Sequence, residues 1–245
     1  MKIIFFCIET DWLTRGQIVK ACELINDNLG IPYTDMELVV KPYKNVSSTV
    51  VAGGSQIFIR RLLRILSLRV FYSAYIRYFL KKTKIKSLSN KQLKIHSIRS
   101  ANSEDAVKIL EETQNPLVFF VYFDEIIKEP ILRLCKPLNV HPGFLPEYRG
   151  VSPVYWQILD GKSIAAISIH RMTPGIDEGD IVAEVPFNIV KKKDSFFTEM
   201  QNYKQNIIAN SLYIAVRRLT KFDESFGITQ SNYKGTPKYF PRPTQ

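Results

Sequence analysis

Two polar side chains that could do chemistry stand at the end of an apolar run, in the stretch NVHPGFLPEYRG at 139–150. Asn139 and His141 are two residues apart, so on a β-strand they project from the same face. Pro142 and Gly143 then end the strand, which places both side chains at its carboxyl end, where ligands bind in open parallel sheets. The alternative is an asparagine that satisfies a loop and a histidine that is buried and hydrogen-bonded.

An aspartate flanked by glycines follows later in the chain, in TPGIDEGDI at 173–181. The glycines predict a tight, irregular loop that can bring Asp177 close to another part of the backbone. A carboxylate beside His141 would orient the imidazole and raise its pKa, which suits a general acid and base near neutral pH. The alternatives are a surface turn and a weak cation loop built from Asp177, Glu178 and Asp180.

The sequence pattern predicts a fold in which strands alternate with helices, and this fold would position these residues. Short runs rich in β-branched and aromatic residues predict strands, and apolar residues recur at helical spacing between them. Ser103 is typical of a helix N-cap. The expected fold class is therefore α/β, a Rossmann-like, mostly parallel sheet with helices on both faces. The strands are predicted at 2–8, 36–41, 92–98, 116–122 and 137–141, and the helices at 15–29, 103–113 and 125–134.

The segment after the motif predicts a different kind of connection. A helix over 152–161 ends at Gly161, and two strands follow at 164–172 and 181–190. Their connection is too short for a helical crossover, so we expect a hairpin or a mixed-sheet extension. A long helix over about 195–222 would close a catalytic domain of 1–225, and the proline-rich tail at 226–245 is expected to be extended.

Length and composition favour one folded domain in a reducing compartment. The chain has 245 residues, of which 45% are apolar. Its cysteines are three in number and far apart, which argues against a disulfide framework and a cysteine-rich zinc site: Cys7, Cys22 and Cys135. The apolar run near the N-terminus is too short for a signal peptide or a spanning helix. We therefore expect a cytoplasmic protein.

The positive charge is concentrated in one segment. The net charge is +11, but nine basic residues and no acidic one lie between Arg60 and Lys86, which leaves +2 for the rest. Residues 56–86 are predicted to form a basic, aromatic-rich helical insertion. It could lie on an anionic membrane surface, or clamp a pyrophosphate or an RNA backbone. The alternative is a lid or core-flanking helix with snorkelling arginines.

Taken together, the two motifs have the pattern of a known family. Residues 139–182 resemble the catalytic segment of the 10-formyltetrahydrofolate formyltransferases: glycinamide ribonucleotide transformylase, the N-terminal domain of methionyl-tRNA formyltransferase, and the sugar N-formyltransferases. With h for an apolar residue, their pattern is approximately N-h-H-P-S-x-L-P-x-x-R-G, a helix, then T-x-H-x-h-x-x-x-h-D-x-G. The resemblance implies an Asn-His-Asp triad at Asn139, His141 and Asp177, without a metal. It also implies 10-formyltetrahydrofolate as the donor, with cofactor-binding residues at Ile126, Ile127, Leu145, Ser168, His170, Gly175 and Ile176.

Several positions depart from that pattern or have a plainer interpretation. Residues 122–127 replace the family's glycine in the folate-binding loop, and ETDWLTRG replaces a glycine-rich phosphate-binding turn after the first strand. Arg149 matches an arginine that more often shapes the loop than performs chemistry. For Ser168 and His170 the alternative is the polar outer face of a half-buried strand. His96 is expected to be structural.

The resemblance implies transfer of a formyl group to a primary amine. An amino sugar, nucleotide-linked or lipid-linked, is the expected acceptor, because methionyl-tRNA formyltransferases carry a further C-terminal domain and only 65 residues follow Asp180 here. Nucleic acid is therefore not the expected partner, whereas an anionic membrane surface would suit residues 56–86 and place the protein at the inner face of the membrane. The other functions left open are a formyltetrahydrofolate hydrolase, a glycinamide ribonucleotide or methionyl-tRNA formyltransferase, and a non-catalytic membrane- or RNA-binding protein. The sequence indicates no oligomeric state.

Overall fold

The computed structural model describes residues 1–8, 12–41, 93–123, 125–189, 207–233 and 235–242. These residues belong to one unit. The basic insertion predicted at 56–86 and the first part of the helix predicted at 195–222 lie outside them, as do residues 9–11 of the turn after the first strand. The boundaries of the predicted domain and tail therefore remain predictions.

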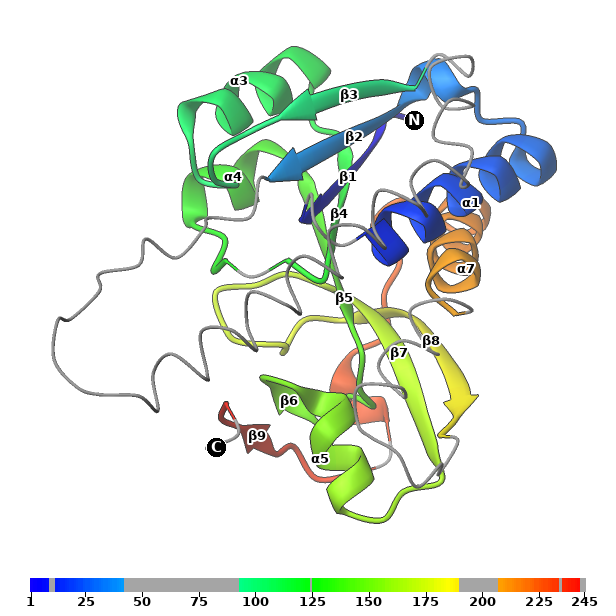
Figure 1. Ribbon diagram of the computed structural model, residues 1–245, viewed down its shortest axis with the longest axis vertical. Helices are drawn as coiled ribbons and strands as arrows, with labels where there is room; N and C mark the ends of the chain where they lie inside the picture. The colour runs from blue at the N-terminus through cyan, green and yellow to red at the C-terminus, as the bar shows by residue number, and fades with distance from the viewer. Residues whose placement is uncertain (9–11, 42–92, 124, 190–206, 234, 243–245) are drawn as a thin grey trace, which may run out of the picture. The chain divides into compact units, whose positions relative to one another are not determined.

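Seven strands of the described part form one sheet, in the order β3-β2-β1-β4-β5-β7-β8 (Figure 1). The first five are parallel, whereas β7 runs antiparallel to both β5 and β8. Both the mostly parallel α/β fold and the hairpin after the motif are thus confirmed. The strands are β1 Ile3–Ile8, β2 Met36–Lys41, β3 Lys94–Ser97, β4 Leu117–Val121, β5 Lys136–His141, β7 Ile164–Arg171 and β8 Ile181–Asn188.

The helices lie close to the predicted segments. They are α1 Trp12–Leu29, α3 Glu104–Thr113, α4 Glu129–Leu134, α5 Pro153–Leu159 and α7 Ile208–Lys221. The Ser103 hydroxyl accepts a hydrogen bond from the Ala106 N–H, which confirms the predicted N-cap. Helix α4 begins four residues later than predicted, because the Glu125 carboxylate and the Lys128 N–H bind the loop before α3 instead of a helical turn.

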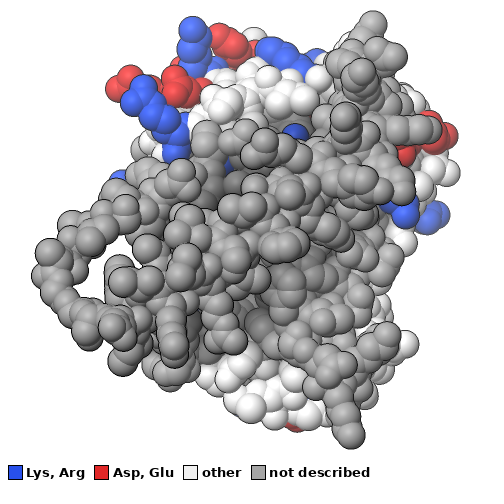
Figure 2. Space-filling model, viewed as in Figure 1, with Lys and Arg blue, Asp and Glu red and all other residues white. Residues whose placement is uncertain are grey.

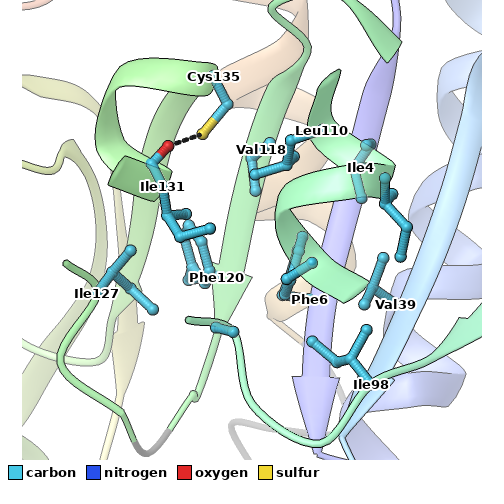
Figure 3. Packing of buried hydrophobic residues seen from close by; sticks show 13 residues of the cluster. Ile4, Phe6, Val39, Ile98, Leu110, Val118, Phe120, Ile127, Ile131 and Cys135 are labelled. Carbon is cyan, nitrogen blue, oxygen red and sulfur yellow. Dashed lines mark hydrogen bonds between the residues drawn. The ribbon is translucent and has the colours of Figure 1, made fainter. Parts of the chain in front are cut away.

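Two apolar layers flank the sheet. Alternate residues of a strand point to opposite faces, so Phe6 and Phe120 pack beneath α3 and α4 (Figure 3), whereas Phe5 and Phe119 pack on the other face. The ring centroids of the two pairs are 4.9 Å and 5.5 Å apart. Helices α1 and α7 contact each other on the side of the sheet opposite α3 and α4 (Figure 1). This double-sided burial fixes the sheet whose carboxyl edge carries the motif.

The C-terminal segment folds back onto the motif. Its described part contains a 3-10 turn, η4 (Gln230–Asn232), and a short strand, β9 (Tyr239–Phe240), which pairs in parallel with β6 (Arg149–Gly150). Gly150 has a φ of +95°, and a Cβ atom there would lie 2.3 Å from the Phe240 carbonyl oxygen. Only glycine allows this approach. The Phe240 ring stacks on Tyr148 and Trp156, so the tail is part of the motif's packing.

The described surface carries no large patch of one charge on the face seen in Figure 2. There, basic side chains lie beside acidic ones over the region of α3 and α4. The sequence places most of the excess positive charge at 60–86, outside the described residues. Among the helices that the structure describes, none has the length and apolar character needed to cross a membrane.

Candidate active site

Four polar side chains share one face of the sheet where β5 meets β7. Asn139 lies directly opposite His170, and His141 lies opposite Ser168. Residues paired in this way point to the same side of an antiparallel ladder. His141, Ser168 and His170 are buried, so the face is interior and the interpretation of Ser168 and His170 as a polar outer face is wrong. Asn139 is partly exposed and marks the side from which a ligand can reach the cluster.

Asp177 completes the cluster from the loop between β7 and β8. Its Oδ1 accepts a hydrogen bond of 3.2 Å from the Asn139 side-chain amide and lies 3.3 Å from His170 Nε2. Its Oδ2 accepts a hydrogen bond of 2.8 Å from the Gly150 N–H and lies 3.5 Å from His141 Nδ1. The structure therefore brings Asn139, His141 and Asp177 together, as the sequence predicts, and adds His170 as a fourth member.

Main-chain carbonyls fix the orientation of both histidines. His141 Nε2 lies 2.6 Å from the Tyr148 carbonyl oxygen, and His170 Nδ1 lies 2.8 Å from that of Arg171. A carbonyl only accepts, so these nitrogens carry the hydrogens. In a neutral ring the other nitrogen is bare, and in both histidines it faces Asp177. The cluster is thus built to take up a proton.

Burial and charge set the protonation state of the cluster. Burial lowers the pKa of His141, although the Asp177 carboxylate opposes this shift. Burial alone would raise the pKa of Asp177, but His141, His170 and the Gly150 N–H together hold it well below its ordinary value. The carboxylate is therefore ionised, and a proton bound by the cluster resides on a histidine.

Comparison with known proteins shows the family of the chain. The family model described as "Formyl transferase" matches residues 76–210, more than half of the chain, and this range contains the whole cluster. The chain belongs to the formyl transferase family. Asn139, His141 and Asp177 therefore lie within the segment that the formyl transferase family shares.

Curated formyl transferase relatives are longer than this chain. The bifunctional polymyxin resistance protein ArnA of Wigglesworthia glossinidia brevipalpis is 30% identical over 145 residues, which cover 58% of this chain and 21% of the relative. A methionyl-tRNA formyltransferase of Borrelia duttonii is 30% identical over 135 residues, which cover 54% of this chain and 42% of the relative. The matched segment thus spans less than half the length of either relative.

Solved structures of the formyl transferase family have the same fold. A sugar N-formyltransferase from Shewanella matches with a TM-score of 0.56 and 15% identity, over 99% of this chain and 77% of that chain. Phosphoribosylglycinamide formyltransferase from Bacillus halodurans matches with a TM-score of 0.55 and 13% identity, over 92% of this chain and 98% of that chain. At such identities these matches establish the fold.

The predicted cofactor-binding residues fall into three groups. Gly175 and Ile176 lie on the loop of Asp177, where Ile176 is 50% exposed, and Ile126 is 83% exposed. Ile127, in contrast, is buried in the core beneath α3 and α4 (Figure 3), so its side chain cannot meet a ligand without disturbing that core. Leu145 is also buried. The remaining two, Ser168 and His170, face the cluster.

A partly buried carboxyl group behind the cluster was not predicted. Glu184 lies opposite Ser168 on β8, so His141, Ser168 and Glu184 form a row across three strands. The Ser168 hydroxyl donates to the Gly143 carbonyl oxygen at 2.7 Å and lies 3.1 Å from Glu184 Oε2. The Ser168 hydroxyl has one hydrogen, which it gives to the Gly143 carbonyl oxygen. A protonated Glu184 can donate its own hydrogen to the Ser168 oxygen, so each of the three groups has a hydrogen-bond partner. Burial raises the pKa of Glu184, in agreement with this arrangement. A charged residue inside the apolar run IVAEV was the only signal in the sequence.

The cluster also has the composition of a cation site. His141, His170 and Asp177 each offer one ligand atom, and these atoms lie within 4.8 Å of one another. The Asp177 carboxylate already accepts hydrogen bonds from Asn139 and Gly150, so its charge is satisfied without an ion. That the site works without a metal remains a prediction.

Proposed function

We propose that this chain transfers a formyl group from 10-formyltetrahydrofolate to a primary amine. The observation that carries the proposal is the buried cluster in which the Asn139 amide, two histidines and the ionised Asp177 meet at the carboxyl end of β5. Membership of the formyl transferase family supports it. A folate donor is supported by two structures of this fold, one solved with 5-N-formyl-THF and one with folinic acid.

In the proposed reaction a neutral amine attacks the formyl carbon while both reactants are held side by side. The carbonyl oxygen becomes an oxyanion as the new C–N bond forms, and it needs an N–H donor. Asn139 is the partly exposed donor of the cluster, whereas both ring nitrogens of His141 face protein atoms. His141 thus acts through its contact with Asp177, rather than by direct contact with the substrate in this geometry.

Proton transfer and oxyanion binding are coupled through His170. In the neutral state the Asn139 side chain gives one N–H to Asp177 and the other to the bare His170 Nε2, 3.3 Å away. Once His170 Nε2 takes a proton, it donates to Asp177 and releases that Asn139 N–H for the oxyanion. The proton comes from the attacking amine and returns to the folate nitrogen as its C–N bond breaks.

We infer that the acceptor is an amino sugar, nucleotide-linked or lipid-linked. Sugar N-formyltransferases share the fold over 99% of this chain, and one of them was solved with dTDP-3-aminofucose. The absence of a glycine-rich turn in ETDWLTRG disfavours the phosphate recognition expected of a glycinamide ribonucleotide transformylase. The cations of residues 60–86 could instead meet a pyrophosphate.

The test is transfer of labelled formyl from 10-formyltetrahydrofolate to amino-sugar nucleotides, amino lipids, glycinamide ribonucleotide and methionyl-tRNA. Wild type is compared with His141→Ala and Asp177→Asn, and with His96→Ala, which removes the third histidine of the chain. We expect transfer to an amino sugar that the first two variants lose and the third keeps. Release of formate without transfer would identify a hydrolase, and no binding of the folate would overturn the proposal.

We further infer that residues 56–86 bind an anionic membrane surface, which would place the protein at the cytoplasmic side of a membrane. The nine basic residues without an acidic one are the support. Vesicles with and without anionic lipid, at two salt concentrations, test this inference. Equal partition after the basic residues of 60–86 are replaced would refute it.

A further inference from the structure

The loop that carries Asp177 holds a strained backbone conformation. Asp177 has a φ of +53°, in the left-handed region that favours glycine. Gly179, two residues later, packs so closely that a Cβ atom there would lie 2.0 Å from the Arg171 carbonyl oxygen. A conformation of this kind persists only when its surroundings over-determine it. Contacts outside the loop must therefore hold Asp177 in place.

The C-terminal segment supplies those contacts through one buried side chain. Gln230 is 4% exposed, and its Nε2 donates to the carbonyl oxygens of Asp177 at 2.7 Å and of Gly179 at 2.9 Å. Its Oε1 accepts from Arg149 Nη2 at 2.7 Å and from Nε at 3.2 Å. The amide thus spans the loop on both sides of the strained residue and ties it to β6.

The same segment also aligns the donor that holds the carboxylate. β9 pairs with β6, and the Gly150 N–H of β6 donates to Asp177 Oδ2. Next to the loop, Ile228 forms a bridge with Ile181, the first residue of β8. The backbone of Asp177 is therefore bound directly by Gln230, 53 positions later, and its side chain is bound by Gly150 of β6, which β9 aligns.

We propose that Gln230 is a positioning residue of the active site, which holds the Asp177 carboxylate against His141 and His170. The described C-terminal residues 228–233 and 235–240 then support the catalytic site rather than form a separate tail. This role deepens the proposed function and rests on it for its catalytic meaning. The placement of the carboxylate, in contrast, can be measured without any substrate.

The first experiment is histidine-ring NMR on the full chain. The chain has three histidines, and His96 pairs with Glu37 on β2, so it reports on the fold independently of the site. The variants are Gln230→Ala and Gln230→Met; methionine fills the space but donates no hydrogen bond. Asn232→Ala, an exposed change in the same turn, is the matched control.

We expect both Gln230 variants to move the ring resonances of His141 and His170 and to lower the titration midpoint of His141, because the nearby carboxylate raises it. His96 should stay unchanged. Wild-type resonances for His141 and His170 in Gln230→Met would overturn the proposal, since the lost donors would then be irrelevant. Movement of all three histidines in both variants would also count against it, as a general loss of fold.

The second experiment separates positioning from binding once the acceptor is known. Gln230→Met should reduce kcat about 100-fold, the effect expected from a misplacement of about 1 Å, and leave KM for the folate nearly unchanged. A rise in KM of similar size, with kcat unchanged, would show that Gln230 shapes a binding surface instead. If wild type transfers no formyl group but the NMR result holds, the proposed function fails and the positioning of Asp177 stands.

Discussion

The Asn139 side chain faces His170 across the β5–β7 pair, with its Nδ2 3.3 Å from His170 Nε2 and 3.2 Å from Asp177 Oδ1. The Asn139 amide has two N–H groups, one for His170 Nε2 and one for Asp177 Oδ1. The number of its donors therefore equals the number of neighbouring acceptors. Neither an aspartate nor a leucine could replace it. The chemistry proposed for the site depends on this match.

Loss of the Asn139 donors should therefore abolish most of the activity. Asn139→Leu keeps the shape but removes both N–H groups, and we expect kcat to fall about 100- to 1000-fold, as for other oxyanion donors. Asn139→Asp should be at least as damaging, because it sets a second carboxylate beside Asp177. Formyl transfer and binding of 5-formyltetrahydrofolate are measured together. Full activity of Asn139→Leu would exclude this residue as the donor.

The stability of the protein should decrease on mild acidification because of His141. Burial lowers its pKa below the ordinary value of 6.5, so the folded state favours the neutral ring. The contribution of neutral His141 to the free energy of unfolding is present above pH 6.5, and it is lost as the pH falls through the lowered folded-state pKa. The free energy of unfolding, measured from pH 7 to pH 5, should fall less steeply in His141→Gln. Parallel curves for the two proteins would contradict this assignment.

Glu184 should make the stability of the protein depend on pH in the opposite direction. Its pKa is raised above the ordinary value of 4.5, mainly by burial, so the folded state favours the protonated acid. That contribution is present below pH 4.5 and is lost as the pH rises through the raised folded-state pKa. Glu184→Gln, which cannot ionise, should therefore gain stability relative to wild type between pH 5 and pH 8. A constant difference between the two proteins over this range would refute the shift.

Gly150 should tolerate no side chain. Gly150→Ala introduces a Cβ atom 2.3 Å from the Phe240 carbonyl oxygen at a φ of +95°. The backbone strain alone is expected to cost about 1–3 kcal/mol, and displacement of β6 should also weaken the contact with Asp177. Gly16→Ala, in α1 with open space around it, is the control and should gain about 0.5–1 kcal/mol. Chemical denaturation of both variants distinguishes a local requirement for glycine from a general sensitivity.

Removal of metal ions should leave the activity unchanged. The Asp177 carboxylate is satisfied by the Asn139 and Gly150 donors, and the proposed chemistry uses no ion. Formyl transfer is measured before and after dialysis against a chelator. A loss of activity that zinc restores would show that His141, His170 and Asp177 form a metal site, for which their ligand atoms are close enough.

Much of the fold was accessible from local sequence patterns. Alternating apolar runs predicted all seven strands of the sheet, and the N-cap at Ser103 was correct. These features depend on the period of a strand or helix and on neighbours within one turn. Helix α4 was predicted too long, because Glu125 and Lys128 bind residues of the loop before α3.

For the site, the sequence by itself determined the candidates Asn139, His141 and Asp177. The spacing of Asn139 and His141 on a strand, and the glycine-flanked Asp177, are local properties that any reader of the chain can see. Only the tertiary structure decided that Ser168 and His170 face inward, because strand alternation defines a face but not which face is buried. It alone brought Gln230 to Asp177, 53 residues away, since no local period specifies a hydrogen bond between a loop and a distant turn.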